Sequence, residues 1–169
     1  MTGGYVIEPL STDHDRLGFS SGVEPLDRYF REQVGQDMRR RIARCLVVRS
    51  GEVVCGYYTF SAASLPMLDL PEDMARKLPR YPVLPAALIG RLAVDHRYRG
   101  RGLGAAMVVD AVDRAIRADL AIHALLVDAK DDPADAFYRH LGLLPLRSRP
   151  RSLFLPLGRI ADRVRGLTP

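Results

Sequence analysis

Residues 91–107 read RLAVDHRYRGRGLGAAM, with glycine at positions 100, 102 and 104. The apolar run 86–95 predicts a buried strand, and the small apolar residues after the glycines predict a helix to about residue 118. A tight strand-to-helix turn explains one glycine but not three. Glycines let a ligand approach the backbone closely, and N–H groups at a helix N-terminus favour phosphate. The stretch therefore predicts a phosphate-binding turn.

Three kinds of phosphate site compete for this stretch. A P-loop needs Gly-Lys followed by Ser or Thr, which the chain lacks. A Rossmann site is formally matched by Gly100, Gly102 and Ala105, with Asp128 as the acid, but its turn should directly follow the first strand. A coenzyme A site fits better, because N–H groups at a helix N-terminus suit a pyrophosphate and nearby arginines suit the additional phosphate.

Composition places the chain among globular proteins. Its 169 residues are enough for a substantial core, so we expect a single domain over residues 1–169. Neither a membrane span of about 18 apolar residues nor a signal peptide is expected. Cys45 and Cys55 stand in apolar runs without metal-ligand spacing. We therefore expect buried thiols, no metal site and a cytoplasmic protein.

Hydrophobic periodicity predicts an α/β (α+β) chain with a mixed sheet whose faces carry helices. Strands are expected at 5–10, 43–49, 53–65, 86–95, 121–129 and 151–157, the second and third forming a hairpin and the last lying at an edge. Helices are expected from about Glu24, within the connection 66–85, from the glycine turn to about residue 118, and over DDPADAFYRHLG between Pro133 and Gly142.

RLAVDHRYRGRGLGAAMVVDAV resembles the acyl-CoA-binding signature of the GNAT acetyltransferase superfamily, Q/R-x-x-G-x-G/A, which Arg99, Gly102 and Gly104 match. FYRHLGLLPL resembles the superfamily's FYxxxGF segment, with Leu143 in place of the usual Phe. The resemblance implies the GNAT fold, with a mixed, mostly antiparallel central sheet and helices on both faces, and acetyl-CoA as acetyl donor. It also implies the residues that hold acetyl-CoA: Leu92, Ala93 and Val94 beside the pantetheine arm, and Arg99, Gly100, Arg101, Gly102, Leu103, Gly104 and Ala105 at the pyrophosphate.

Further segments resemble the GNAT toxins of bacterial toxin–antitoxin pairs. FSSGVEPLDRYF, VVCGYYTFSAASL, the glycine stretch, LLVDAKDDPADAFYRHLGLLPL and RSLFLPL occur in the order found in that branch. The resemblance implies an aminoacyl-tRNA substrate, an antitoxin of the ribbon-helix-helix type and a homodimer. Ser20 and Ser21 stand where Asp-Cys is common in the branch, a change that we expect to affect helix capping rather than chemistry.

Acetyl transfer needs a neutral amine, a polarised thioester carbonyl and a proton for the leaving thiolate. The resemblance puts Tyr138 in the role of general acid, and a phenol with a pKa of about 10 suits that task. A backbone N–H on the strand 92–94 is the candidate for polarising the carbonyl. No His or Glu stands at an obvious base position. An α-amine, with a pKa of about 7.7–8.0, needs less help than a lysine.

Arginine clusters give the chain a formal net charge of +5. A substrate RNA would need such a basic surface, for which Arg39–Arg41, Arg44, Arg91 and Arg147–Arg151 are candidates. Any one of these arginines is more simply explained as a solvated surface charge than as an RNA contact. As a set, the C-terminal group, Arg147–Arg151, is the strongest candidate for binding RNA. Two alternatives stay open: a GNAT enzyme acting on a protein N-terminus or small-molecule amine, and a non-catalytic CoA-binding regulatory module.

Overall fold

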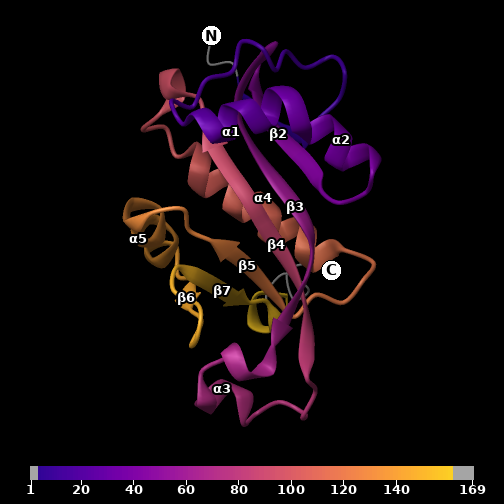
Figure 1. Ribbon diagram of the computed structural model, residues 1–169, viewed down its shortest axis with the longest axis vertical. Coiled ribbons are helices and arrows are strands. Elements are labelled where there is room, and N and C mark those ends of the chain that lie inside the picture. The colour runs from indigo at the N-terminus through magenta and orange to yellow at the C-terminus, as the bar shows by residue number, and fades with distance from the viewer. Residues whose placement is uncertain (1–3, 162–169) are drawn as a thin grey trace. The chain divides into compact units, whose positions relative to one another are not determined.

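A computed structural model describes residues 4–161 (Figure 1). These residues divide into two compact units. The N-terminal unit contains the chain up to Ser61 together with Ile89–Ala111, and the C-terminal unit contains Ala62–Leu88 together with the chain from Val112. In chain order the described elements are β1 (Tyr5–Pro9), α1 (Glu24–Arg28), a π-helical turn (Tyr29–Gln33), α2 (Val34–Arg39), β2 (Arg44–Ser50), β3 (Val53–Pro66), a 3-10 turn (Met67–Asp69), α3 (Glu72–Ala75), β4 (Val83–Val94), a second 3-10 turn (His96–Tyr98), α4 (Leu103–Arg117), β5 (Ala124–Asp128), α5 (Asp132–His140), β6 (Leu144–Pro145) and β7 (Ser152–Pro156).

The strands formed by the described residues have the order β1-β2-β3-β4-β5-β7-β6. The sheet is mixed and mostly antiparallel, which confirms the predicted class. The predicted hairpin is present: β2 pairs antiparallel with β3, with Cys45 opposite Thr59. Its register shifts between Val48 and Arg49, as at a β-bulge.

Helices cover both faces of the sheet in the N-terminal unit. Successive side chains of a strand point to opposite faces, so Tyr57 and Tyr58 of β3 face different helices. The Tyr57 ring stacks on Phe30 at a centroid distance of 4.3 Å, and its hydroxyl donates to the Leu26 carbonyl at 2.6 Å. The Tyr58 hydroxyl donates to the Asp110 carboxylate on α4 at 2.7 Å. The expectation of helices on both faces is confirmed within this unit.

The helix predicted from about Glu24 is interrupted by its π-helical turn. The N–H of Val34 bonds to the carbonyl of Tyr29, five residues back. This wider turn accommodates one extra residue. As a result, Tyr29, Phe30 and Val34 are all buried in the core between helix and sheet. Phe19 reaches the same core and meets Phe30 edge-on at a centroid distance of 5.1 Å.

The C-terminal unit has its own core, formed by Leu65, Leu70, Leu84, Ala86, Ala124, Leu126, Leu146 and Phe154. Figure 1 shows β5, β7 and β6 side by side, with α5 next to them. Within residues 4–161 no helix is both long and apolar enough to cross a membrane.

The prediction that 151–157 forms an edge strand was wrong. In β7, Phe154 lies opposite Leu126 of β5 on one side and opposite Leu144 of β6 on the other. The edge strand is β6, whose two residues are too few to show a periodic pattern. Two boundaries also differ from prediction: β4 begins at Val83 rather than 86, and β5 begins at Ala124 rather than 121.

Gly56 marks a close approach of β3 to β4. A Cβ at Gly56 would lie 3.0 Å from the carbonyl oxygen of Ala93 and 3.2 Å from Cε of Met107. Because a backbone oxygen cannot move aside, Gly56→Ala should lower the free energy of unfolding by about 1–3 kcal/mol in urea denaturation. Gly4→Ala is the control, since its Cβ would meet nothing within 4 Å. Equal stability of the two variants would contradict the close approach.

Candidate functional site

The glycine turn leads directly into α4. Gly100 and Gly102 have φ of 74° and 75°, in the left-handed region that favours glycine. A Cβ at either residue would meet no atom within 4 Å, so conformation rather than packing requires these glycines. The N–H of Ala106 bonds to the carbonyl of Gly102 at 3.0 Å, which places the N–H groups of residues 103–105 at the N-terminus of a fifteen-residue helix. This backbone fits the predicted pyrophosphate site.

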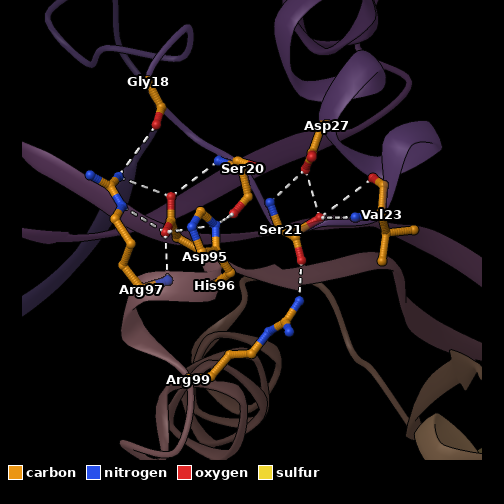
Figure 2. Close-up of polar contacts among 9 residues, drawn as sticks. All are labelled: Gly18, Ser20, Ser21, Val23, Asp27, Asp95, His96, Arg97 and Arg99. Carbon is orange, nitrogen blue, oxygen red and sulfur yellow. Dashed lines mark hydrogen bonds and ion pairs between the residues drawn. The ribbon is translucent and has the colours of Figure 1, made fainter.

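The basic side chains of the turn are engaged within the protein. Arg99 donates to the carbonyl of Ser21, and Nη2 of Arg97 donates to the carbonyl of Gly18 at 3.3 Å (Figure 2). The backbone N–H of His96 donates to the carbonyl of Ser20 at 2.9 Å. The side chain of Arg99 holds the Gly18–Val23 segment, which leaves its backbone N–H for the predicted cofactor contact.

Asp95, directly after β4, is the residue that sequence reasoning missed. Its side chain is completely buried, and its carboxylate accepts from the N–H of Ser20 at 3.1 Å. It also accepts from the N–H, Nε and Nη2 of Arg97 at 2.9, 3.0 and 3.0 Å. Burial raises the pKa of this carboxyl, but the hydrogen bonds outweigh burial and lower the pKa to about 2. An acid just after an apolar strand, with arginine two residues later, was the available signal.

Asp27 organises the segment that leads into α1. Its Oδ1 accepts from the N–H of Ser21 at 2.9 Å and from the Ser21 hydroxyl at 2.6 Å, and the Ser21 oxygen accepts from the N–H of Val23 at 3.1 Å (Figure 2). Val23 precedes the helix, which no side chain caps. The expectation of a capping role for Ser20 and Ser21 was therefore wrong: Ser21 ties the segment to a buried carboxylate.

The predicted pantetheine strand, Leu92–Val94, is the end of β4. Just before it, the hydroxyl of Thr59 on β3 accepts from the N–H of Arg91 at 3.0 Å. A Cβ at Gly90 would lie 3.2 Å from the same hydroxyl oxygen. Gly90 thus lets a side chain of β3 serve as hydrogen-bond partner to the backbone of β4.

Arg91 links this strand to α2. Its Cζ lies 3.6 Å from the centroid of the Tyr29 ring, within the range of a cation–π contact. The Tyr29 hydroxyl donates to Oδ2 of Asp37 at 2.8 Å. Burial is the main cause that raises the pKa of Tyr29 far above its ordinary value, and the hydrogen bond to Asp37 is the second. Arg91, a predicted RNA contact, therefore has one face of its guanidinium covered by Tyr29.

Arg101, another predicted cofactor contact, lies near two tyrosines of the same unit. Its Nη1 donates to the hydroxyl of Tyr5 at 3.1 Å, and its Cζ lies 5.0 Å from the centroid of the Tyr98 ring. The Cζ of Arg97 is 5.8 Å from the same centroid. Tyr98 thus has two guanidinium groups near its ring, beside the glycine turn.

Tyr138 lies on α5, in the C-terminal unit. The helix has the predicted Pro133 in its first turn, and Oδ1 of Asp131 caps it by accepting from the N–H of Ala134 at 2.9 Å. Gly142, with φ of 98°, follows its end as predicted.

The environment of Tyr138 favours a protonated phenol. Burial of the ring, and then the charge of Asp128, raise the pKa of Tyr138 to about 12. Among residues 4–161 the Tyr138 hydroxyl has no protein hydrogen-bond partner. Every side-chain nitrogen or oxygen atom of these residues that is fully buried does have a partner. The hydroxyl oxygen therefore reaches accessible surface although the residue is only 6% exposed. A buried ring with an open hydroxyl is suited to proton donation.

The positive charge of the C-terminal arginine cluster is balanced by carboxylates of the same unit. Its three arginines pair at N–O distances of 3.1, 3.0 and 2.8 Å: Arg147 with Glu72, Arg149 with Asp69, and Arg151 with Asp132. Asp69 is buried and also accepts from the hydroxyl of Ser148. Ion pairing therefore weakens the argument from charge that favoured this cluster for RNA binding.

Cysteine and histidine side chains are the remaining candidates for reactive or metal-binding groups. Within residues 4–161 no group of three or more His, Cys, Asp or Glu side chains could hold a metal ion. Cys45 and Cys55 are free and buried as predicted, and burial raises the pKa of the Cys45 thiol to about 12. His96 lies against the carbonyl of Ser20, and His140 is exposed at the end of α5.

A model of the acetyltransferase (GNAT) family matches residues 11–143. The chain belongs to the GNAT acetyltransferase family. The match includes the glycine turn, Asp95 and Tyr138, and the sheet and helices described above form the GNAT fold. A probable toxin TacT of Sinorhizobium fredii is 32% identical over 167 residues, 92% of each chain. A tRNA-acetylating toxin of Mycobacterium tuberculosis is 38% identical over 143 residues, 83% of this chain and 84% of that one.

Solved structures of GNAT toxins are similar over almost the whole chain. AtaT complexed with acetyl-methionyl-tRNAfMet has a TM-score of 0.87 and 30% identity, covering 95% of this chain and 99% of that one. AtaTR bound with acetyl-CoA has a TM-score of 0.80 and 30% identity, covering 95% and 98%. A tyrosine-to-phenylalanine variant of AtaT, bound to the C-terminus of the antitoxin AtaR, has a TM-score of 0.80 and 27% identity, covering 98% and 99%.

Replacing Asp95 by Asn keeps the shape of the side chain and removes its charge. Asp95→Asn should lower the free energy of unfolding at neutral pH by about 2–3 kcal/mol, because Ser20 and Arg97 lose a charged acceptor. The folded pKa of about 2 lies below the ordinary 3.8, so the wild type has this stability in full above about pH 4 and loses it as the pH falls toward about 2.

Urea unfolding of the wild type and Asp95→Asn across this pH range measures the effect. The difference between the two proteins should be constant above about pH 4 and shrink below it. Asp113→Asn is the control, since Asp113 pairs with Arg117 on the exposed side of α4 and should matter by less than about 0.5 kcal/mol. A difference as large at acid pH as at neutral pH would show that the charge of Asp95 is not what stabilises the fold.

Proposed function

We propose that the chain transfers the acetyl group of acetyl-CoA to the α-amino group of aminoacyl-tRNA and blocks translation, as the toxin of a toxin–antitoxin pair. The observation that carries the proposal is the 38% identity over 143 residues with a tRNA-acetylating toxin. The likeness to AtaT complexed with acetyl-methionyl-tRNAfMet supports the same class of substrate. An acetylated α-amine is no longer a nucleophile, so the modified amino acid cannot accept a growing peptide.

We assign acetyl-CoA binding mainly to backbone groups, and the similar acetyl-CoA complex of AtaTR supports this ligand. The N–H groups of the glycine turn, at the N-terminus of α4, suit the pyrophosphate. The end of β4 would pair with the pantetheine arm, and one of its N–H groups would polarise the thioester carbonyl. The coenzyme supplies the activated acetyl group. The proposed binding residues are Leu92, Ala93, Val94, Arg99, Gly100, Arg101, Gly102, Leu103, Gly104 and Ala105.

Tyr138 is the proposed general acid. Its raised pKa, about 12, keeps the phenol protonated throughout the neutral range. A thiol has an ordinary pKa of about 8.5, so complete proton transfer from this phenol to a thiolate is uphill. The hydroxyl therefore donates a hydrogen bond to the leaving sulfur and passes its proton to the thiolate as the proton lost by the amine, carried by water, replaces it on the phenol oxygen. The products are the N-acetyl amine and the thiol of coenzyme A. This role needs an unpartnered, accessible hydroxyl.

The surroundings of the histidines support an amine that deprotonates by itself. His96 is bonded to the Gly18–Val23 segment, and His140 is exposed on α5. The backbone of His123 bonds to Pro85 and Leu157. An α-amine, with a pKa of about 7.7–8.0, has an appreciable neutral fraction at neutral pH, whereas a lysine with a pKa of about 10.4 does not. Water is a sufficient acceptor for the proton of such an α-amine.

The proposed assembly includes an antitoxin partner, as in a similar toxin complex. A cytoplasmic homodimer that is held inactive by an antitoxin of the ribbon-helix-helix type is proposed, and the complex of AtaT with the C-terminus of AtaR supports an antitoxin partner. We also propose that residues 1–169 act as one acetyltransferase domain, because the family match over 11–143 draws on residues of both units.

The decisive experiment combines the protein with labelled acetyl-CoA and total charged tRNA. Label should enter the RNA fraction and be released by mild base as an N-acetyl amino acid, which mass spectrometry identifies. Deacylated tRNA is the matched control and should stay unlabelled. Label found only on protein or on small amines would exclude the proposed substrate and favour another amine. An absence of turnover would favour a regulatory CoA-binding module.

Tyr138→Phe removes one hydroxyl and keeps the ring. The variant should lose about 10²–10⁴-fold in kcat, with the KM for acetyl-CoA unchanged, because the hydroxyl serves only the leaving group. Its free energy of unfolding should stay within about 0.5 kcal/mol of the wild type, since the hydroxyl bonds to no protein group among residues 4–161. Tyr81→Phe, at an exposed tyrosine, is the control for initial rates. A Tyr138→Phe variant with full kcat would contradict the assigned role.

A further inference from the structure

A second arginine cluster lies where α2 ends and β2 begins. Residues 39–44, RRRIAR, form what we call the arginine turn. Its four arginines, Arg39, Arg40, Arg41 and Arg44, are all exposed. Within the part of the chain that the structure describes, no carboxylate pairs with any of them, in contrast to the paired cluster at 147–151. The turn therefore presents a concentrated positive charge to solvent.

The backbone of this turn is strained at one arginine. The N–H of Ile42 bonds to the Asp37 carbonyl at 2.9 Å and that of Arg41 to the Met38 carbonyl at 3.1 Å, which is the Schellman pattern of a helix end. Arg41 occupies its left-handed position with φ of 58°. A side chain there costs stability that glycine would not. Arg151 of the 147–151 cluster is also left-handed, with φ of 63°, but its side chain pairs with Asp132, whereas that of Arg41 pairs with no carboxylate among residues 4–161.

Helix α5 ends in the same pattern and provides an internal comparison. The N–H of Leu143 bonds to the Tyr138 carbonyl at 3.1 Å and that of Gly142 to the Arg139 carbonyl at 3.0 Å. Here the left-handed position is glycine, with φ of 98°. The next residue also differs: Leu143 is buried, whereas Ile42 after Arg41 is 58% exposed. The arginine turn thus gives up both the glycine and the apolar contact that usually stabilise such an end.

Two guanidinium groups also lie beside Gly35. A Cβ at Gly35 would lie 3.3 Å from Nη1 of Arg39 and 3.6 Å from Nη1 of Arg16. The Arg16 group donates to the carbonyl of Phe30 at 3.2 Å, which fixes its position. Like charges on the same side of the helix repel each other, and a bound anion would relieve the repulsion. This pair extends the positive surface of the turn along α2.

Contacts within the N-terminal unit hold the turn in place relative to β4. The backbone carbonyl of Asp37 accepts from Ile42, and its carboxylate accepts from Tyr29. The Tyr29 ring in turn lies against the guanidinium of Arg91, next to the predicted pantetheine strand. The arginine turn is thereby positioned by the strand that is proposed to hold the acetyl donor.

We propose that the arginine turn and Arg16 bind the phosphate backbone of the RNA substrate, and that the paired cluster at 147–151 does not. This inference rests on the proposed function. Unpaired, exposed arginines provide the charge that displaces counterions from a phosphate backbone, and ion-paired ones provide less. The turn positions RNA without reading its sequence, since phosphate contacts carry no base information.

The first test compares two variants that each lose two positive charges. Arg40→Gln/Arg44→Gln alters the turn, and Arg80→Gln/Arg117→Gln alters exposed arginines elsewhere. Fluorescence anisotropy with deacylated tRNA over a salt series measures Kd and its salt slope. The turn variant should bind about tenfold more weakly, with a salt slope smaller by about 1–2, and the control should stay within about twofold. Equal losses in the two variants would overturn the proposal.

A second test uses the strain at Arg41. Arg41→Gly should raise Tm by about 2–4 °C, because it relieves the left-handed residue, and should also weaken tRNA binding. Arg41→Lys keeps the charge and should bind tRNA like the wild type. A stabilised Arg41→Gly variant with unchanged affinity for tRNA would overturn the proposal.

The binding assay separates this inference from the proposed function. Deacylated tRNA binds without turnover, so affinity at the turn is measured whether or not RNA becomes acetylated. Intact salt-dependent binding without any acetylated product contradicts only the proposed function. A wild type that does not bind tRNA, or a turn variant that loses only its affinity for an acidic protein segment, overturns the role of the turn.

Discussion

The buried carboxylate of Asp95 connects the parts of the N-terminal unit that surround the glycine turn. It accepts hydrogen bonds from Ser20 and Arg97, and the neighbouring residues His96 and Arg99 bond to the carbonyls of Ser20 and Ser21. The segment before α1 is thus held against the start of the turn by charged and polar contacts, in addition to the apolar packing of Phe19. A backbone proposed to bind phosphate must be rigid before the ligand arrives, and a carboxylate with a pKa of about 2 stays charged at all physiological pH.

Ion pairing separates the two arginine clusters, although they look alike in the sequence. At 147–151 each arginine meets an acid of the same unit, and buried Asp69 fixes one of them. At 39–44 the arginines are exposed, and none of them pairs with a carboxylate among residues 4–161. Charge that is offset within the protein contributes to its structure, whereas charge that is left exposed is available to a polyanion. Arginine therefore stabilises the structure in one cluster and is available to bind a polyanion in the other.

Local patterns predicted much of this protein correctly. β-branched and aromatic residues around a Gly-containing turn placed the β2–β3 hairpin, and the spacing of apolar residues placed α4. Pro133 and Gly142 placed α5. The same reasoning failed at β7, which lies between β5 and the two-residue β6, because a strand that short has no period to detect. It also gave no sign of the partners of these arginines, because the side chains of Arg97 and Arg99 bond to a segment more than seventy residues earlier.

The sequence by itself determined the family, the glycine turn and the short helix that carries Tyr138, because a helix start, a left-handed glycine and a short motif are set by neighbouring residues. Only the tertiary structure decided which charges are paired, that the Tyr138 hydroxyl is open although its ring is buried, and that Asp95 joins two distant segments. These properties depend on partners far away in the chain. Burial and electrostatic pairing act through space, so no local pattern encodes them.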